Sequence, residues 1–199
     1  MREPFDTLLS RCRGPLTFTT PLVPKVRDGS KTRTMRIIHP QPDDVSVGVP
    51  VYEGHKAILP RFAPGDLAYV AEGLRCDCDD IVYVADNTIA VPVSGPMEYW
   101  HWKPSILSSR FMPKRFARTI LGIDDVGAQR VQEISEAEIL AEGVRGDCYP
   151  ELGQPTCSDA RSARIYMADL WDSIHRRPPE DWASNPWTRP IAFHVEATR

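Results

Sequence analysis

Residues 29–36 read Gly29-Ser30-Lys31-Thr32-Arg33-Thr34-Met35-Arg36, and residues 134–143 read Ile134-Ser135-Glu136-Ala137-Glu138-Ile139-Leu140-Ala141-Glu142-Gly143. The first segment gathers an amine, hydroxyls and guanidinium groups, and the second predicts a short helix that ends on a carboxylate. Together they offer Lys31, Thr34 and Glu142 as a proton-transfer set. Arg36 is available beside them to hold an anion or an oxygen-rich ligand. The two segments therefore predict a ligand pocket, and an enzyme is one interpretation of it.

The predicted helix covers residues 135–142. Ser135 and Glu138 have the spacing of a capping box, and Gly143 stands where a left-handed C-terminal residue is favoured. The helix macrodipole disfavours negative charge at the C-terminal end, so Glu142 needs another reason for its place. Burial would raise the pKa of this carboxyl towards the range useful for acid-base chemistry, whereas a nearby cation would lower it. The alternative interpretation is a surface glutamate on an acidic helix.

Lys31 and Thr34 lie three residues apart, and in a strand such residues face opposite ways. They can cooperate only if the backbone bends, which Gly29 permits. A threonine hydroxyl becomes a nucleophile when a base takes its proton, and lysine serves as that base when its pKa is lowered by burial or charge. The competing interpretation is a solvated basic strip in which Thr34 is an ordinary strand residue.

At 199 residues with 42% hydrophobic residues, the chain can bury one sizeable core, and we expect a single domain over residues 1–199. The formal net charge of -3 excludes the global positive charge that drives non-specific duplex binding, so any nucleic-acid contact must be local. No apolar run approaches the roughly 18 residues that span a membrane, and the first residues contain no signal-peptide apolar region. We therefore expect a cytoplasmic protein without a membrane partner. Residues 29–36 lack the glycines of a phosphate-binding loop, and no cofactor is expected.

The five cysteines are too sparse for a disulfide scaffold, which fits a reducing compartment. Four of them, Cys76, Cys78, Cys148 and Cys157, offer a four-thiolate zinc site as an alternative. Structural zinc usually uses spacings of two to four residues in each half of the site. We therefore expect free thiols and no metal.

Nineteen prolines break the chain into short elements and favour strands and loops over long helices, which predicts an α+β fold. Strands are predicted at residues 67–71, 80–85, 118–123 and 191–195. A second helix is predicted after Ser158 and before Pro178, with Met167, Leu170, Trp171 and Ile174 as its core-facing stripe. Long loops are expected at about 39–62 and 144–157, and such loops are often functional.

The segment 99–118 interleaves aromatic and basic residues and contains no acidic one. Trp102 and Arg115, with their neighbours, could stack bases and hold phosphates. The alternative interpretation is that the tryptophans pack under a loop.

The chain resembles the ASCH domains of the PUA-like superfamily, in the version common in bacteriophage genomes. The signature Gly29-x-Lys31-Thr32-x-Thr34-x-Arg36 is similar to the family's Gly-x-Lys-Thr-x-Thr-Arg-Arg, with Met35 in place of the first arginine. Further landmarks follow in the family's order: Pro64-Gly65-Asp66, Glu72, Met112-Pro113, Arg118, Ile134-Ser135-Glu136, Glu142-Gly143, Leu170-Trp171-Asp172-Ser173-Ile174 and Asn185-Pro186-Trp187. Ordered agreement over most of the chain is more specific than any one landmark.

This resemblance implies a small, strongly bent β-barrel with helices packed outside and a cleft beside the Gly-x-Lys signature. Members of the family are expected to bind RNA, nucleosides or modified bases. One small bacterial relative is an amidohydrolase that removes acyl groups from the exocyclic nitrogen of acetylated cytidine. By that resemblance Lys31 acts as base, Thr34 attacks the amide carbonyl, and Glu142 orients the amine or relays protons to the leaving nitrogen.

The chain departs from the family pattern at several positions. Ala71 stands where an arginine is usual, and Leu67-Ala68-Tyr69 replaces a tryptophan-bearing pattern. Arg189-Pro190 interrupts the final strand, and because proline cannot donate to a ladder, that strand is predicted to be an edge or to be bulged there. The wall of the cleft therefore differs from the usual one.

Our leading hypothesis is a cytoplasmic phage-type ASCH protein, located in the host cytoplasm if phage-encoded, whose cleft recognises a modified pyrimidine nucleoside or nucleotide. Hydrolysis of an acyl amide on that ligand is its candidate activity. The candidate ligand-binding residues are Arg36, Glu72, Trp102, Arg115 and Arg118. A rival hypothesis is a non-catalytic reader of RNA, other single-stranded nucleic acid or modified bases. A third is a virion or host-takeover protein that inherits only the fold.

Overall fold

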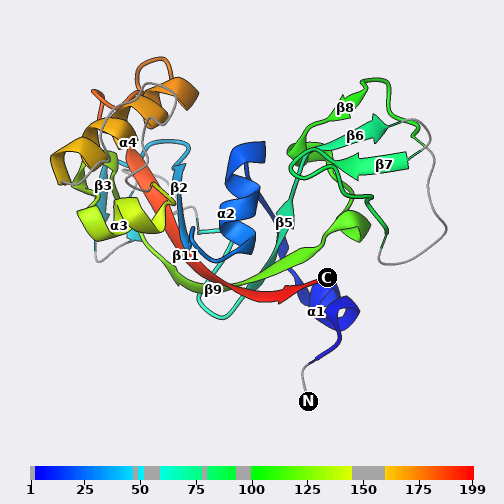
Figure 1. Cartoon of the computed structure of the whole chain (residues 1–199). Helices are drawn as coiled ribbons and strands as arrows, with labels where there is room; N and C mark the ends of the chain where they lie inside the picture. The colour runs from blue at the N-terminus through cyan, green and yellow to red at the C-terminus, as the bar shows by residue number, and fades with distance from the viewer. Residues whose placement is uncertain (1–2, 47–48, 52–58, 78–79, 93–99, 145–159) are drawn as a thin grey trace. The chain divides into compact units, whose positions relative to one another are not determined.

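The computed structural model describes residues 3–46, 49–51, 59–77, 80–92, 100–144 and 160–199, which form helices, 3-10 turns and strands (Figure 1). The chain divides into two compact units. Unit 1 comprises residues 1–30, 62–124 and 193–199, and unit 2 comprises residues 31–61 and 125–192. The α+β class predicted from the sequence is confirmed.

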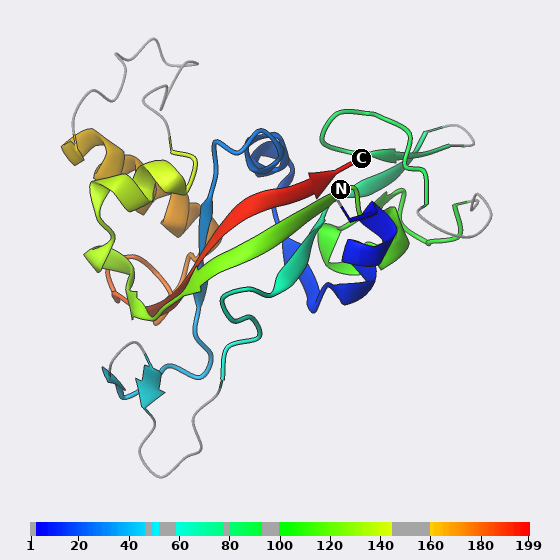
Figure 2. The same cartoon turned by 90° about the horizontal axis from the view of Figure 1, so that it is seen from below.

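Unit 1 contains the helices α1 (Phe5–Arg11) and α2 (Val23–Arg27) and the 3-10 turns η1 (Thr20–Leu22), η2 (Ser109–Phe111) and η3 (Lys114–Phe116). Its strands are β1 (Gly14–Thr17), β5 (Leu67–Ala71), β6 (Leu74–Asp77), β7 (Asp80–Tyr83) and β8 (Ile106–Leu107), with most of β9 (Thr119–Val126) and the end of β11 (Trp187–Thr198). β1 runs parallel to β5, β5 is antiparallel to β9, and β9 neighbours β11 (Figure 2). β7, β6 and β8 form a separate sheet.

The core of unit 1 forms around β5, in which Ala68, Tyr69, Val70 and Ala71 are all buried. A strand paired on both sides and covered by other elements buries both faces, so its sequence is continuously apolar and does not alternate. Leu8 and Leu9 of α1 belong to the same cluster of buried side chains. Burying one such large apolar side chain contributes about 1.5–3 kcal/mol.

Unit 2 contains β2 (Arg33–Ile37), β3 (Asp44–Ser46), β4 (Val49–Val51), β10 (Gln129–Arg130), η4 (Val131–Glu133), α3 (Glu136–Ala141), α4 (Ala160–Ile174) and the first part of β11. β2 pairs antiparallel with β11, placing Thr34 opposite Ile191, and β10 pairs with the same strand. α3 and α4 pack together (Figure 1), and their apolar side chains form one buried cluster with Met35 of β2.

β11 is paired on both sides at Pro190, so the predicted edge strand is wrong. Pro190 lies opposite Met35 of β2, and its carbonyl accepts a hydrogen bond from the Gly127 amide at 3.1 Å. The amide and carbonyl of one strand residue point to the same side. The missing N–H of Pro190 therefore faces Gly127, and the ladder with β2 loses no hydrogen bond.

The helix predicted after residue 158 is confirmed as α4, but its stripe is only partly core. Met167 and Trp171 are 4% exposed and Leu170 packs against the cluster, whereas Ile174 is 56% exposed. Ile174 is the last residue of α4, where no further turn covers it. Among the described residues, no helix has both the length and the apolar character needed to cross a membrane.

The segment 39–62, predicted as loop, contains the antiparallel pair β3 and β4. Its β-branched residues, such as Val45 and Val51, suit a pleated surface and explain the strands. The predicted loop at 144–157 lies, apart from Val144, outside the described residues. Cys78, Cys148 and Cys157 lie outside them as well, while Cys12 is a free, buried thiol.

Candidate functional site

Helix α3 places a carboxylate at its C-terminal end, as the sequence predicted. Ser135 accepts a hydrogen bond from the Glu138 amide at 3.3 Å, and the Glu138 carboxylate accepts one from the Ser135 amide at 2.7 Å. This capping box satisfies two amides that the first turn leaves unpaired. The helix ends at Glu142, and Gly143 follows with φ +82°, a backbone conformation that glycine adopts at little cost.

The amine of Lys31 meets that helix end. Nζ donates to Oε2 of Glu142 at 2.6 Å and to the Glu142 carbonyl at 2.8 Å. The Thr32 amide donates to the carbonyl of Ala141 at 2.9 Å, which ties the start of β2 to the last turn of α3. Gly29, at which the sequence permits a bend, adopts φ +76°. Lys31 therefore both pairs with the carboxylate and satisfies a terminal carbonyl of the helix.

The Lys31–Glu142 pair is almost completely buried, with side chains 1% and 8% exposed. Burial raises the pKa of Glu142, although Lys31, Arg33 and Arg36 oppose the rise. Oε1 of Glu142 is also buried and has no hydrogen-bond partner among the described residues. A buried polar atom without a partner is costly, and each such atom needs an explanation, of which a functional role is one. This atom can accept a hydrogen bond, or donate one when the acid is protonated.

Thr34 and Arg36 lie on the same face of β2, since side chains alternate along a strand. Thr34 is 5% exposed, whereas the Arg36 side chain keeps solvent-accessible surface while its charge acts on Glu142. Arg33 points to the other face, where it pairs with Glu138 at 2.7 Å. The structure thus joins Lys31 directly to Glu142 and places Arg36 within electrostatic range of the pair.

Glu72 and Arg118 form a second buried group, in unit 1. Nε and Nη2 of Arg118 donate to the two carboxylate oxygens of Glu72 at 2.9 and 2.6 Å. Nη1 donates to Asp86 and to Thr88, both at 2.8 Å. The guanidinium also lies over the Tyr83 ring, 3.7 Å from its centroid. All three nitrogens of Arg118 and both oxygens of Glu72 are therefore already bound within the protein.

Trp102 is half-buried and packs against the core cluster of unit 1. Its ring meets that of Trp100 edge to face at 4.9 Å, and the Trp100 indole donates to the carbonyl of Pro104. This arrangement agrees with the alternative interpretation of the segment, in which the tryptophans pack within the protein. Arg115 is also half-buried and lies 5.5 Å from the Phe116 ring centroid.

The predicted site residues thus form two groups, with Lys31, Thr34, Arg36 and Glu142 in unit 2 and Glu72, Trp102, Arg115 and Arg118 in unit 1. Asp86 and Arg27 also belong to the second group, through hydrogen bonds of Asp86 with Arg118 and Arg27. No local sequence pattern predicted either of them as a site residue. Asp86-Asn87-Thr88 resembles an ordinary turn, and Asn87 does adopt φ +59° there.

No family model and no curated protein matches the chain. Two solved structures are similar to it. One is a crystal structure of a protein from Enterococcus faecalis V583 assigned to the DUF984 family model, with a TM-score of 0.42 and 12% identity over 94% of this chain and 80% of that one. The other is an ASCH domain from Lactobacillus crispatus JV V101, with a TM-score of 0.40 and 12% identity over 96% of this chain and 91% of that one. Neither likeness assigns a ligand or an activity to this chain.

Proposed function

We propose that Lys31 and Glu142 form the proton-transfer centre of an amidohydrolase. Its substrate is a pyrimidine nucleoside or nucleotide with an acylated exocyclic nitrogen. The observation that carries the proposal is Oε1 of Glu142, a buried carboxyl oxygen that has no hydrogen-bond partner within the described ranges, while Oε2 accepts a hydrogen bond from Lys31. A ligand polar group can complete this site.

The hydrogen-bonding edge of cytosine carries a group that is a suitable partner for Oε1 of Glu142. A carboxylate accepts a hydrogen bond from the exocyclic N4 amine of cytosine, which is a standard base-reading contact. N-acylation leaves one hydrogen on that nitrogen, so the contact survives in the acylated base. The guanidinium of Arg36, whose pKa is lowered by burial and raised by the charge of Glu142, is suited to a phosphate or another ligand oxygen.

The reaction needs a proton on the leaving nitrogen. Because burial raises the pKa of Glu142, a protonated fraction persists closer to neutral pH, as a general acid requires. In the proposed sequence the shared proton of the pair lies on Glu142, so the neutral amine of Lys31 accepts the Thr34 proton as the hydroxyl oxygen bonds to the acyl carbon and the carbonyl electron pair moves to its oxygen. That pair returns as the carbon-nitrogen bond breaks, Glu142 donates its proton to the leaving nitrogen, and Lys31 passes its own proton back to Glu142. Water then hydrolyses the ester, which releases the carboxylic acid and restores the Thr34 hydroxyl.

The test is hydrolysis of cytidine acetylated on its exocyclic nitrogen, followed by chromatography. Glu142→Gln keeps the side-chain shape but removes the acid, and we expect at least about a hundredfold loss of kcat. Thr34→Val removes the nucleophile at nearly constant volume and should abolish turnover. Thermal unfolding of each variant shows whether the fold is retained.

Absence of turnover in the intact protein contradicts the amidohydrolase. If single-stranded RNA then binds, and Trp102→Ala or Arg115→Ala weakens that binding with a salt-dependent slope, the protein is a reader. Turnover that survives Glu142→Gln and Thr34→Val places the chemistry elsewhere.

A further inference from the structure

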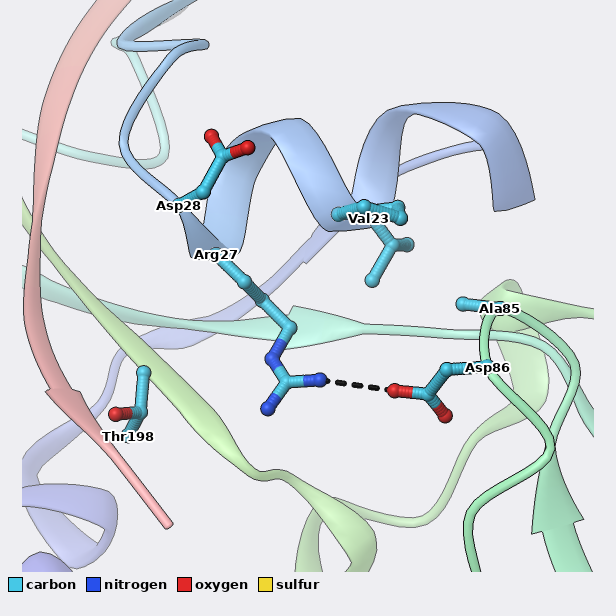
Figure 3. Close-up of a pocket in the computed structure, with 7 residues that line it drawn as sticks. Val23, Arg27, Asp28, Ala85, Asp86 and Thr198 are labelled. Carbon is cyan, nitrogen blue, oxygen red and sulfur yellow. Dashed lines mark hydrogen bonds and ion pairs between the residues drawn. The ribbon is translucent and has the colours of Figure 1, made fainter.

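A pocket of about 390 Å³ lies in unit 1, beside α2 and the end of β11 (Figure 3). Its lining residues are Val23, Pro24, Arg27, Asp28, Ala85, Asp86 and Thr198. This volume falls within the range typical of small-molecule sites. An adjoining pocket of about 370 Å³ shares Arg27 and Asp86 with it.

Arg27 is held in this pocket by one nitrogen. Nη1 donates to Oδ2 of Asp86 at 3.0 Å, the contact drawn in Figure 3. Asp86 is fixed in turn by Arg118, which donates to the same oxygen at 2.8 Å, and by Thr88, which donates to Oδ1. Burial alone would raise the pKa of Asp86, but the hydrogen bonds from Thr88 and Arg118 lower it to about 2. The anchor of Arg27 is therefore ionised at neutral pH.

The edge of the Arg27 guanidinium that carries Nε and Nη2 makes no hydrogen bond to the described residues. Within the described part of the chain, Nη1 is the only nitrogen of Arg27 that makes a hydrogen bond, and Nε is buried without a partner. In Figure 3 the side of the group remote from Asp86 faces Thr198 across the pocket. Two parallel N–H groups on one edge of a guanidinium match the two oxygens of a carboxylate or a phosphate.

The charges around the pocket allow an anion to bind. The Asp86 carboxylate already forms ion pairs with Arg27 at 3.0 Å and with Arg118 at 2.8 Å, so two cations offset its negative charge. The Asp28 carboxylate points away from the guanidinium in Figure 3 and accepts a hydrogen bond from the Ser30 amide. Thr198 lines the wall opposite the guanidinium. Val23 and Ala85 can cover the apolar part of an organic anion.

We propose that this pocket is a binding site for a small oxyanion, a carboxylate or a phosphate, to which Arg27 donates hydrogen bonds from Nε and Nη2. The site is independent of the Lys31–Glu142 centre and does not rest on the proposed function. A ligand oxygen at Nε would remove the cost that a buried donor without a partner carries.

The test is calorimetric titration of the whole protein with inorganic phosphate and, separately, with succinate, at constant ionic strength. The ¹⁵N resonance of the Arg27 Nε–H group is followed in parallel. Arg27→Lys keeps the charge but loses the paired donors, and we expect at least about a tenfold weaker affinity. The matched control is Arg13→Lys, because Arg13 also pairs through Nη1 with an aspartate, Asp66 at 3.1 Å, but lies 54% exposed at the surface. Affinity should be unchanged in the control.

Binding of phosphate or of succinate that depends on Arg27 supports the site, and the tighter of the two identifies the chemical class of its ligand. Binding that is equal in Arg27→Lys and the intact protein overturns the proposal. So does the absence of binding and of any shift of the Arg27 Nε resonance at about 10 mM of either anion, a concentration that detects even millimolar affinity.

Discussion

Nζ of Lys31 lies 2.6 Å from Oε2 of Glu142 and 2.8 Å from the carbonyl oxygen of the same residue. One amine thus neutralises the carboxylate at the C-terminal end of α3 and satisfies a carbonyl that the helix leaves unpaired. A cation there also opposes the negative end of the helix dipole. The unfavourable position of Glu142 is in this way compensated by a residue 111 positions away in sequence.

Replacing Lys31 by methionine should destabilise the protein by about 3–5 kcal/mol at neutral pH, because Glu142 is left buried without its partner. The loss should depend on pH. Without Lys31 the pKa of Glu142, already raised by burial, rises further. When the pKa of a carboxyl is raised in the folded state, its contribution to the free energy of unfolding is fully present below the unfolded-state pKa of 4.5. That contribution is lost as the pH rises through the folded-state pKa. Chemical unfolding at pH 5 and pH 8 should therefore show the smaller deficit at pH 5.

The double variant Lys31→Met with Glu142→Leu is the control for this effect. It removes both charges, so most of the stability should return and the added pH dependence should disappear. A double variant as unstable as Lys31→Met alone would mean that the lost packing of the lysine chain, and not the unpaired charge, causes the destabilisation.

Arg118→Lys should cost about 2–4 kcal/mol, because a lysine cannot bind both oxygens of Glu72 or stack on Tyr83. Urea unfolding measures the change. The matched control is Arg11→Lys, whose partner Glu3 lies in an exposed pair at 2.7 Å, with side chains 60% and 37% exposed. That change should stay within about 0.5 kcal/mol. Equal losses in the two variants would contradict a special contribution from the buried pair.

The sequence predicted α3 and the position of Glu142 because their signals are local. Ser135, Glu138 and Gly143 lie within nine residues, and each acts through the backbone next to it. β6 was less predictable. Arg75, Cys76 and Asp77 have little preference for strands, and the pairing of this segment with β7 and β8 gives it its conformation.

The hydrogen-bond network around Asp86 could not be predicted either, because its members are distant from one another in sequence. Arg27 lies 59 residues before Asp86, and Arg118 lies 32 residues after it. Nothing in the short segment Asp86-Asn87-Thr88 distinguishes a buried anchor from a solvated turn. Resemblance pointed to Glu72 and Arg118 as ligand-binding residues, but only the coordinates show that their polar atoms bind each other.

Gly143→Ala should destabilise the protein by about 1–2 kcal/mol, because φ +82° places a Cβ against the following carbonyl. The end of α3 should shift, and with it the carboxylate of Glu142. Gly143→Asn should cost less, since asparagine tolerates this conformation better than alanine. Thermal unfolding of both variants checks the order, and an alanine variant as stable as the asparagine variant would contradict it.

Asp86→Asn should remove a pH-dependent part of the stability. The folded-state pKa of Asp86 is about 2, below its ordinary value of 3.8, because hydrogen bonds from Thr88 and Arg118 outweigh burial. A lowered pKa gives stability that is complete above 3.8 and is lost as pH falls through about 2. Since the side chain is 32% exposed, solvent screening reduces the contribution to about 1–2 kcal/mol.

Urea unfolding of the intact protein and of Asp86→Asn between pH 2 and pH 7 measures this contribution. The difference in free energy of unfolding should be constant above about pH 5 and should shrink steadily below pH 4. Thr88→Val removes the hydroxyl that donates to Asp86 at 2.7 Å and so raises the pKa of that carboxyl. Its loss of stability on acidification should therefore be smaller, and should end at a higher pH, than in the intact protein. A difference between the intact protein and Asp86→Asn that stays constant down to pH 2 would show that the carboxylate is not held ionised by these hydrogen bonds.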